Sequence, residues 1–375
     1  MKKKMLIFHP ALAPYRIDQF NTLNELFDLD VVFLYDNLWT FKFDQVLLLS
    51  QCTFKVSFLL IGPRHKGKVF RFGMYKKIKS INPDLILGYE YSFTTQYLIL
   101  LKRLGLIKQK IGSMIDDSLD MCYNIQSGIR YQARKYSIDY LDYIVLMSHE
   151  VSLYYQDHLN FKKEKIIVSP IIQNPDRLRK NSKQIESFAE RYVSKYDLMG
   201  KKVLLFVGRL IPEKALPLFL NNIYSLLLED LDLVFVIVGE GREDELLQPI
   251  IKEKKLDDRV LLVGRYDNEE LYSWYLSASG FVLPSLFEPF GAVVNEALIF
   301  GLPVFCSKYA GASCLTTTDN GLIFDPSNNE NTLQRLKLFL TMIDPLHSLE
   351  LRNKPSLMDD DILNFNEEWR KLIYS

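Results

Sequence analysis

The 375-residue chain has few cysteines and no long hydrophobic run, and these absences exclude several classes of protein. Its four cysteines form no C-x-x-C pair, so neither a zinc site nor a disulfide framework is expected. No apolar run is long enough to span a bilayer. The apolar stretch that follows Met1-Lys2-Lys3-Lys4 ends at Phe8, which is too short for a secretory signal. We therefore expect a cytoplasmic protein with reduced thiols, whose contact with a membrane is peripheral if it has one.

The chain also lacks an overall charge of either sign, because 46 Lys and Arg balance 46 Asp and Glu. The charges are unevenly placed: residues 1–180 hold 26 Lys/Arg against 17 Asp/Glu, and residues 181–375 hold 20 against 29. Such an asymmetry favours different partners for the two halves. The sequence has no basic tail, no zinc-finger spacing and no RNA-binding motif, so we expect no nucleic-acid partner.

What the chain does contain is an alternation of short apolar runs with stretches of helical spacing. In the first half the runs predict buried parallel strands at Met5–Phe8, Val31–Tyr35, Leu85–Leu87, Lys110–Met114, Tyr143–Met147 and Ile166–Val168. Helical spacing covers stretches between them such as Arg16–Phe27 and Thr94–Leu104. This alternation is typical of a doubly wound α/β sheet.

A second alternation starts after a polar, charged stretch at residues 176–200, which we interpret as a connector. Its predicted strands are Val203–Val207, Val234–Val238, Val260–Val263, Gly280–Leu283, Pro303–Cys306 and Gly321–Phe324. Residues 360–375 have the apolar spacing of an amphipathic helix, which we expect to pack back on the first domain. The predicted architecture is two doubly wound domains, 1–175 and 201–358, which bind ligands at the carboxyl ends of their strands.

The first segment that carries chemistry is Phe206–Lys214, a strand that runs into a turn with two cations. Arg209 offers a planar fork for phosphate oxygens and Lys214 a compact charge, so together they can neutralise a diphosphate leaving group. The alternative is a pair of solvated cations at a strand end. The glycines of Val238-Gly239-Glu240-Gly241 mark either a plain sharp turn or a close approach of a ligand to the backbone.

The strongest segment runs from Leu283 to Leu298 and predicts a strand, a loop with Glu288 and a helix that starts near Gly291. The free N–H groups and the positive dipole end of such a helix favour a phosphate. Glu288 and Glu296 flank this anion site and can accept hydrogen bonds from sugar hydroxyls. The alternatives are charge complementation of the helix N-terminus by Glu288 and a solvated helix face for Glu296.

Gly208-Arg209 with Lys214, the Val-Gly-Glu-Gly turn and the Glu288–Glu296 pair resemble the donor-binding set of the GT-B glycosyltransferases of family 4. The resemblance covers residues 201–330 and implies two Rossmann-like domains that face each other across a cleft. It further implies a retaining transfer from a nucleotide-diphosphate sugar, a UDP- or GDP-sugar, without a metal or other cofactor. The implied acceptor is a glycan or lipid-linked molecule, and the implied setting is bacterial cell-surface polysaccharide or glycolipid synthesis.

The resemblance also implies roles for individual residues. Arg209 and Lys214 would hold the diphosphate and Glu288 the hydroxyls of the donor sugar, which makes these three the expected catalytic residues. Glu296 would bind the ribose. The nucleotide base would lie near the adjacent pair Arg265-Tyr266. Further donor contacts are expected from Gly208, Gly239, Pro289, Phe290, Gly291 and Ala292.

The first half departs from the family pattern at two places. Where members often have a glycine-rich loop, this chain reads His9-Pro10-Ala11-Leu12-Ala13-Pro14-Tyr15-Arg16. Arg16 either binds an anion through its side chain or caps a helix, and Tyr15 is a further candidate on the acceptor side. Where members often have a histidine after a middle strand, the chain has Asp116 and Asp117. Either aspartate contacts the sugar or acceptor, or it caps a helix.

Two other acidic or basic stretches bear on cofactors and partners. Neither Asp116-Asp117 nor Asp359–Asp361 has a nearby histidine partner, so no catalytic metal is expected. His65–Lys79 interleaves cations with aromatics. This stretch either lies on an anionic bilayer, which suits a lipid-linked acceptor at the inner face of a membrane, or is a solvated helix with a few core contacts.

Two further functions share the predicted architecture. One is a nucleotide-sugar epimerase of the same fold, which needs paired acid and base groups at the sugar, and the sequence shows no such pair. The other is a binding protein that has kept the donor pocket and lost transfer, which the departures at Ala11–Pro14 and Asp116 leave open.

Overall fold

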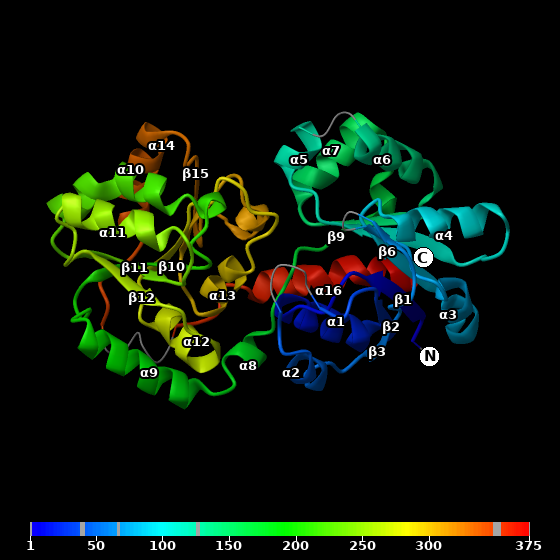
Figure 1. Cartoon of the computed structure of the whole chain (residues 1–375), viewed down its shortest axis with the longest axis horizontal. Helices are drawn as coiled ribbons and strands as arrows, with labels where there is room; N and C mark the ends of the chain where they lie inside the picture. The colour runs from blue at the N-terminus through cyan, green and yellow to red at the C-terminus, as the bar shows by residue number, and fades with distance from the viewer. Residues whose placement is uncertain (1, 38–41, 66–67, 125–127, 348–353, 375) are drawn as a thin grey trace. The chain divides into compact units, whose positions relative to one another are not determined.

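The computed structural model describes residues 2–37, 42–65, 68–124, 128–347 and 354–374, and the chain divides into two compact units (Figure 1). The first unit comprises Met1–Gln173 with Ile362–Ser375, and the second comprises Asn174–Asp361. Each unit is built around one parallel sheet covered by helices.

The first unit contains a seven-stranded sheet in the order β3-β2-β1-β6-β7-β8-β9, with every neighbouring pair parallel. Its strands are β1 (Lys4–His9), β2 (Asp28–Phe33), β3 (Lys55–Phe58), β6 (Leu85–Tyr89), β7 (Lys110–Ile115), β8 (Tyr143–Leu146) and β9 (Ile166–Val168). The chain winds outward from β1 to β3 and then returns to place β6 on the other side of β1. The direction of winding therefore reverses between β1 and β6, which makes this the switch point of the sheet.

Helices and one small hairpin connect these strands. They are α1 (Pro14–Leu26), α2 (Gln45–Ser50), β4 (Arg64–His65), β5 (Lys68–Val69), α3 (Met74–Ile81), α4 (Phe93–Arg103), α5 (Leu119–Asn124), α6 (Gly128–Tyr140), α7 (His149–Leu159) and the 3₁₀ turn η1 (Lys163–Lys165). Local chemistry sets their ends. For example, α7 begins where the Ser148 hydroxyl accepts a hydrogen bond from the Val151 N–H, and it ends at Asn160 in the left-handed conformation (φ 52°).

The last helix, α16 (Asp359–Tyr374), completes the first unit. It buries Phe365, Trp369 and Leu372. The Trp369 indole packs edge-on against Phe27, with 6.5 Å between ring centroids, and its Nε1 donates a hydrogen bond to Ser169 Oγ at 2.9 Å. A segment from the far end of the chain thus forms part of the core of the first unit.

The second unit contains a six-stranded parallel sheet in the order β12-β11-β10-β13-β14-β15. Its strands are β10 (Lys202–Val207), β11 (Leu233–Val238), β12 (Val260–Gly264), β13 (Gly280–Leu283), β14 (Val304–Ser307) and β15 (Gly321–Phe324). Its helices are α8 (Pro175–Leu178), α9 (Ser182–Lys195), η2 (Pro212–Lys214), α10 (Leu216–Glu229), α11 (Asp244–Glu253), α12 (Asn268–Leu276), α13 (Val293–Ile299), η3 (Gly311–Leu315) and α14 (Asn329–Leu340). The switch point lies between β10 and β13.

The segment 176–200, expected as a connector, packs on the second unit. Helix α9 lies against α12, where the Tyr192 and Trp274 rings stack with 4.5 Å between their centroids. The Ser277 hydroxyl at the end of α12 donates to the Ala189 carbonyl at 3.4 Å. This segment is therefore packed as part of the second unit.

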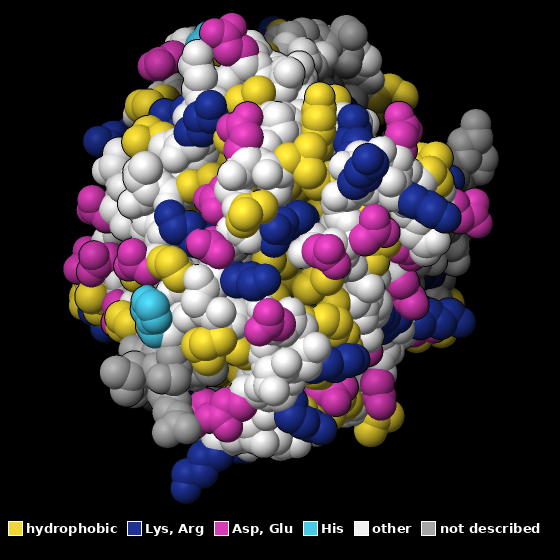
Figure 2. All heavy atoms as spheres, turned by 90° about the vertical axis from the view of Figure 1, so that its left-hand side faces the viewer, with side chains coloured by type: hydrophobic (Ala, Val, Ile, Leu, Met, Phe, Trp, Pro, Cys, Tyr) yellow, Lys and Arg dark blue, Asp and Glu magenta, His cyan; other side chains and the backbone are white. Residues whose placement is uncertain are grey.

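On one face of the second unit, acidic and basic side chains are interspersed. Figure 2 shows the face on which α11 lies, where Lys and Arg side chains alternate with Asp, Glu and apolar ones. This face presents no continuous patch of one sign to a charged partner.

The two parallel sheets confirm the predicted fold class of two doubly wound α/β units. One strand was predicted about two residues too late: β2 spans Asp28–Phe33 and not Val31–Tyr35. Asp28 obscures its start in the sequence, and in the structure this side chain pairs with Lys55 of the neighbouring β3 at 2.7 Å. The edge strand β3 itself was missed, because its four residues contain only two strongly apolar side chains.

Candidate functional site

The segments that follow β10 and β13 lie together at the switch point of the second sheet. The Leu286 N–H donates to the Glu213 carbonyl at 2.9 Å, which ties the loop after β13 to the turn after β10. Across this junction, Lys214 Nζ donates to Glu288 Oε2 in an ion pair. The structure thus brings together two residues that the sequence places 74 positions apart, at the position where open α/β sheets bind ligands.

The Lys214–Glu288 ion pair is largely shielded from water. The two side chains expose 13% and 14% of their surface. In such surroundings charges interact more strongly than at an open surface, and each charge needs a partner. An arriving anion would compete with Glu288 for the ammonium group of Lys214, and a hydroxyl could donate to the carboxylate that is released.

The glycine turns next to this pair are required by packing of one backbone against another. A Cβ on Gly239 would lie 1.8 Å from the Gly208 carbonyl oxygen, and one on Gly241 would lie 2.2 Å from the Leu210 carbonyl oxygen. The Leu210 N–H donates to the Glu240 carbonyl at 3.0 Å. The turns after β10 and β11 therefore support each other, and Gly239 has a structural function whether or not it contacts a ligand.

The loop that carries Glu288 is held in place by the segment after β14. Gly311 N–H donates to the Glu288 carbonyl at 3.0 Å, and Ala312 N–H donates to the Phe290 carbonyl at 2.6 Å. Gly291 has φ 97°, and a Cβ there would lie 2.8 Å from Leu283 Cδ2 and 3.1 Å from Glu288 Cγ. These restraints hold the backbone of the loop on both sides of Glu288.

The predicted helix begins two residues after Gly291, with Ala292 as the residue before it and Val293 as its first. Pro289 is exposed and Phe290 is 7% exposed, so the loop turns one side to solvent and one to the core. Within α13, Glu296 Oε2 accepts a hydrogen bond from the Tyr275 hydroxyl at 2.7 Å.

Tyr275 orients Glu296 from the neighbouring helix α12. Its side chain is fully buried, and burial raises the pKa of Tyr275 well above its ordinary value, followed by the effect of the Glu296 charge. The phenol thus remains a hydrogen-bond donor and holds the Glu296 carboxylate in a fixed orientation. Sequence reasoning missed Tyr275, because an aromatic residue in a helix is far more often simple core packing.

The other three donor-side candidates lie in different surroundings. Arg209 is exposed, and the structure gives it no ion pair among the described residues. Arg265 lies 3.3 Å from Glu240 and 3.3 Å from Asp267 at an exposed position. Tyr266 packs its ring on α9 and α12, 5.4 Å from Tyr192 and 5.7 Å from Trp274 between centroids. Arg209 is thus unengaged, whereas Tyr266 already has aromatic partners.

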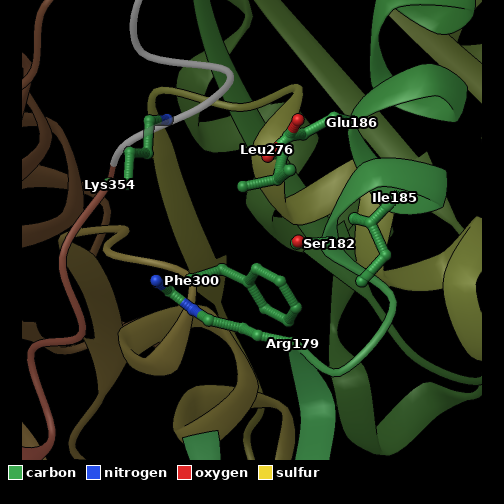
Figure 3. Close-up of a pocket in the computed structure, with 7 residues that line it drawn as sticks. All are labelled: Arg179, Ser182, Ile185, Glu186, Leu276, Phe300 and Lys354. Carbon is green, nitrogen blue, oxygen red and sulfur yellow. The ribbon is translucent and has the colours of Figure 1, made fainter. Parts of the chain in front are cut away.

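A small pocket elsewhere in the second unit is not a donor site. Its volume is about 50 Å³, room for one or two water molecules, and it is lined by Arg179, Ser182, Ile185, Glu186, Leu276, Phe300 and Lys354 (Figure 3). Figure 3 shows Arg179 alongside the Phe300 ring, 5.4 Å from its centroid. Arg179 donates to the Ile299 carbonyl and Lys354 to the Ala278 carbonyl. Both cationic side chains at this pocket are therefore already bonded to backbone carbonyl oxygens.

The switch point of the first sheet carries a second group of charged side chains. Arg16, at the start of α1, is 3% exposed and places Nη2 2.7 Å from Asp116 Oδ2 and Nη1 2.7 Å from Gln19 Oε1. Its guanidinium also lies 6.0 Å from the centroid of the half-buried Tyr15 ring. Of the alternatives for Arg16, the structure shows an ion pair across the sheet edge and no capping of a carbonyl at a helix end.

Asp117 cannot contact a substrate as it stands, because its side chain is 0% exposed. It accepts hydrogen bonds from Arg130, Arg134 and Tyr155, at 2.6, 2.9 and 2.9 Å. The capping alternative falls to Ser118, whose hydroxyl accepts from the Met121 N–H at 3.2 Å. Asp117 is therefore a structural anchor, and of the two aspartates only Asp116 is open to solvent, with 42% of its side chain exposed.

Two titratable groups at this edge were missed by sequence reasoning: His9, which is buried, and Glu90, whose side chain is 24% exposed. Burial, followed by the charge of Arg16, lowers the pKa of His9 to about 3, so the imidazole is neutral. Burial raises the pKa of Glu90 to about 7, against the effect of Arg130. Glu90 directly follows β6, so the rule that ligands bind at carboxyl strand ends was the signal that pointed to it.

The described residues contain neither a cluster suited to a metal ion nor a helix suited to span a membrane. No group of three or more His, Cys, Asp or Glu side chains in the described part of the chain is arranged to hold a metal ion. Among the helices described, none combines the length and the apolar character needed to cross a bilayer.

Comparison with known proteins finds a family model that matches part of the chain. Residues 189–354 match the model of the Glycosyl transferases group 1 family. The chain is 28% identical over 165 residues to a 2-deoxystreptamine N-acetyl-D-glucosaminyltransferase of Niallia circulans, covering 44% of this chain and 42% of that protein. It is 25% identical over 306 residues to an uncharacterized glycosyltransferase of Haemophilus influenzae, covering 80% of both.

A third relative and a solved structure extend this result. The chain is 35% identical over 163 residues, 43% of each protein, to the N-acetylgalactosamine-N,N'-diacetylbacillosaminyl-diphospho-undecaprenol 4-alpha-N-acetylgalactosaminyltransferase of Campylobacter jejuni. The match thus spans less than half the length of this relative and of the Niallia enzyme. Anabaena Alr3699/HepE, solved in complex with UDP, superimposes with a TM-score of 0.70 over 99% of both chains at 15% identity, which shows a common fold.

Proposed function

We propose, from the match of residues 189–354 to the group 1 glycosyltransferase model, that this chain is a glycosyltransferase which transfers a sugar, with retention, from a nucleotide-diphosphate sugar to a glycan or lipid-linked acceptor. The observation that carries the proposal is the shielded Lys214–Glu288 ion pair at the switch point of the second sheet. A cation and a carboxylate side by side suit a ligand that joins a phosphate to a hydroxylated ring.

The proposed roles follow from the surroundings of each side chain. The unpaired, exposed Arg209 and the ammonium group of Lys214 bind the diphosphate and neutralise the charge that develops as the sugar leaves. Glu288 then accepts hydrogen bonds from the sugar hydroxyls, and Glu296, held by Tyr275, accepts them from the ribose. No metal is required in this scheme, because the two cations supply the positive charge.

The donor is a UDP- or GDP-sugar. HepE, which shares the fold, was solved with UDP, and this supports UDP as the first candidate. The base then lies near Arg265, whose exposed guanidinium is held by two carboxylates at 3.3 Å. Tyr266 is the weaker half of the predicted pair, because its ring already packs against two aromatic side chains.

The setting we propose is bacterial cell-surface polysaccharide or glycolipid synthesis. The name of the Campylobacter relative specifies a diphospho-undecaprenol acceptor, and that of an Escherichia coli relative, 23% identical over 229 residues, specifies an O-antigen chain. Both names describe acceptors that are glycans, one of them linked to a lipid. An acceptor of this class is consistent with a chain whose first unit is rich in Lys and Arg.

We also propose peripheral contact with an anionic membrane through the segment around α3. Ile61 and Phe72, whose backbones are joined by a 2.9 Å hydrogen bond from Phe72 N–H, are 77% and 58% exposed. Lysines of α3 follow directly. In the basic and aromatic stretch His65–Lys79, Lys66 and Gly67 lie outside the described residues, and Arg71 is buried with Nε donating to the Leu34 carbonyl at 2.8 Å. Sedimentation with anionic vesicles at low salt tests the contact, which Phe72→Ser should weaken.

The experiment that tests the donor site is a thermal-shift screen of the full chain against UDP, GDP, ADP and their sugars in EDTA. Ligand at 100 times its Kd adds about 2.7 kcal/mol of stability, which is readily measured. We expect one nucleotide family to raise the melting temperature, and Glu296→Ala to abolish the shift. Glu253→Ala, an exposed carboxylate on α11, is the control that should keep it.

The outcomes separate the three functions considered. No shift with any nucleotide contradicts the proposal. A shift without hydrolysis or transfer of the donor sugar favours the binding protein, and inversion at the sugar C2 without transfer favours the epimerase. A shift that appears only when a divalent metal replaces EDTA would overturn the metal-free part of the scheme.

A further inference from the structure

The carboxyl edge of the first sheet holds a network of six charged side chains in two layers, which we call the edge cluster. It consists of Arg16, Glu90, Asp116, Asp117, Arg130 and Arg134. The inner layer, Asp117 with Arg134, is 0% exposed and is completed by the Tyr155 hydroxyl, which Tyr91 contacts in turn. A buried network with its main bonds satisfied is rigid, so it can hold an outer layer in a fixed position.

The outer layer is open to solvent. Glu90 Oε2 and Arg130 Nη2 are 2.7 Å apart, and their side chains are 24% and 32% exposed. Asp116, 42% exposed, stands beside them, because its N–H donates to Glu90 Oε1 at 2.9 Å. Arg130 also reaches inward to Asp117, which anchors the outer layer to the inner one.

The backbone at Glu90 is strained and clamped. Glu90 has φ 50°, in the left-handed region that a residue with a side chain seldom adopts. Three hydrogen bonds hold it there: its N–H donates to the Met114 carbonyl at 2.6 Å, and its carbonyl accepts from Ser113 Oγ at 2.6 Å and Thr95 Oγ1 at 2.8 Å. Strain that the surroundings enforce in this way is concentrated at functional sites.

The cluster also has hydrogen-bonding capacity left over. Arg16 is 97% buried, its Nη2 points at Asp116, and its Nε lacks a hydrogen-bond partner among the described residues. The same is true of Arg130 Nε and Asp116 Oδ1. Buried polar atoms without partners are unusual in proteins and mark positions where a ligand or a water molecule completes the network.

The balance of charge decides the ligand class. Both guanidinium groups that contact the outer carboxylates are already paired, the buried Arg16 with Asp116 and the partly exposed Arg130 with Glu90. A phosphate would have to approach two carboxylates and displace one of them, which is unfavourable. A sugar hydroxyl can donate to a carboxylate and accept from a guanidinium at the same time, without disturbing either pair.

We infer that Glu90, Arg130 and Asp116 form the binding site for hydroxyl groups of a neutral sugar ring of the acceptor. This inference rests on the proposed transferase function and adds Glu90 and Arg130, which no motif includes, to the acceptor candidate Asp116. Glu90 is the central residue, because it contacts both other members of the outer layer.

The test measures sugar binding by saturation-transfer NMR on the full chain, with methyl glycosides of glucose, galactose, mannose and N-acetylglucosamine as probes. At least one glycoside should bind the wild-type protein. Glu90→Gln should weaken that binding at least about tenfold, the effect of losing a hydrogen bond to a charged group. Gln retains an oxygen for the Asp116 N–H, so the variant should fold.

Asp142→Asn is the matched control. Asp142 also accepts from a backbone N–H, that of Ile111 at 2.7 Å, and pairs with a cation, Lys102, at 32% and 30% exposure. It differs in lying at the opposite end of the sheet, where β7 begins. Asp142→Asn should bind the glycoside as the wild type does.

Three results would overturn the inference: no glycoside binds the wild type, Glu90→Gln binds as tightly as the wild type, or Asp142→Asn loses binding equally. Competition by inorganic phosphate at millimolar concentration would also overturn it in favour of an anion site. The nucleotide thermal shift is the separate readout of the donor site, so a failure of this inference with that shift intact leaves the proposed transferase standing.

Discussion

At the scale of single residues, the ion pair between Lys214 and Glu288 determines how each behaves in the site. Each side chain is more than four-fifths buried and depends on the other for compensation of its charge. Removal of either partner therefore has two consequences, the loss of its own contact with a ligand and an uncompensated charge on the partner. A double variant separates the two, because it removes both charges together.

We predict that Lys214→Ala lowers kcat by about 10²–10³, since the ammonium group stabilises charge on the leaving diphosphate as an oxyanion donor does. Steady-state transfer or donor hydrolysis measures it. Lys337→Ala, an exposed lysine of α14, should retain wild-type turnover. Near-wild-type kcat in Lys214→Ala would remove this lysine from the chemistry.

A second residue-scale prediction concerns the stability of the first unit against pH. The folded pKa of Glu90 is about 7, above its ordinary 4.5, because burial outweighs the attraction of Arg130, while Asp116 and Asp117 raise it further. Between pH 4.5 and pH 7, Glu90 is protonated in the folded state and ionised in the unfolded state. The contribution of this proton to the free energy of unfolding is therefore complete below pH 4.5 and is lost as the pH rises through 7.

Between pH 5 and pH 8, wild type should therefore lose about 1–3 kcal/mol of stability relative to Glu90→Gln, in which the group does not titrate. Urea unfolding of both proteins at the two pH values measures this difference. The other carboxylates titrate in both proteins and cancel. An unchanged difference would show that Glu90 is ionised throughout this range.

The residues of the two sites differ in how readily the sequence reveals them. Lys214 and Glu288 lie in segments whose glycines, proline and charges follow a family motif, and the structure joins them. Glu90 and Arg130 are 40 positions apart and lie in no motif, so only the topology that places β6 beside β7 brings them together. Tyr275 could not have been predicted, because its hydroxyl alone distinguishes it from an ordinary core aromatic.

At the scale of elements, the turns after β10 and β11 act as one unit, since the backbone of one occupies the space where a side chain of the other would be. The position of Lys214, just beyond the first turn, therefore depends on the second. Gly239 thus contributes to the geometry of the site through packing.

Gly239→Ala should destabilise the second unit by about 2–4 kcal/mol, because its Cβ would lie 1.8 Å from the Gly208 carbonyl oxygen and the backbone must move. Gly264→Ala is the matched control. It also has a positive φ, 83°, yet nothing lies within 4 Å of the added Cβ. The free energy of unfolding of that variant should fall by only about 1–2 kcal/mol, the cost of the left-handed conformation for alanine. Equal urea midpoints for the two variants would contradict the packing argument.

The elements themselves were predictable where apolar runs are uninterrupted. The strands β13 and β15 begin and end where their runs do, at Gly280–Leu283 and Gly321–Phe324. Prediction failed at β2 and β3, a pair at the edge of the first sheet, where Asp28 and Lys55 replace apolar side chains and pair with each other instead. None of the four side chains of β3 is buried, so its sequence carries a weaker apolar signal.

At the scale of the whole molecule, the two units have separate cores, and α16 belongs to that of the first. We predict that Trp369→Ala destabilises the first unit by about 3–5 kcal/mol. Removal of the fully buried indole leaves a cavity and removes the hydrogen bond to Ser169. The nucleotide-induced thermal shift of the second unit should persist. Loss of that shift would mean that the two units do not unfold separately.

The path of the chain has one more consequence, for synthesis on the ribosome. The second unit is contiguous, from Asn174 to Asp361, so it can fold as soon as it has emerged. The first unit is translated earlier but lacks Phe365, Trp369 and Leu372 until translation has passed them. The apolar surface that these side chains cover therefore stays exposed while the second unit is synthesised. The half that is synthesised first is thus the half that matures last, and until then it is the part of the nascent chain most exposed to chaperones and to aggregation.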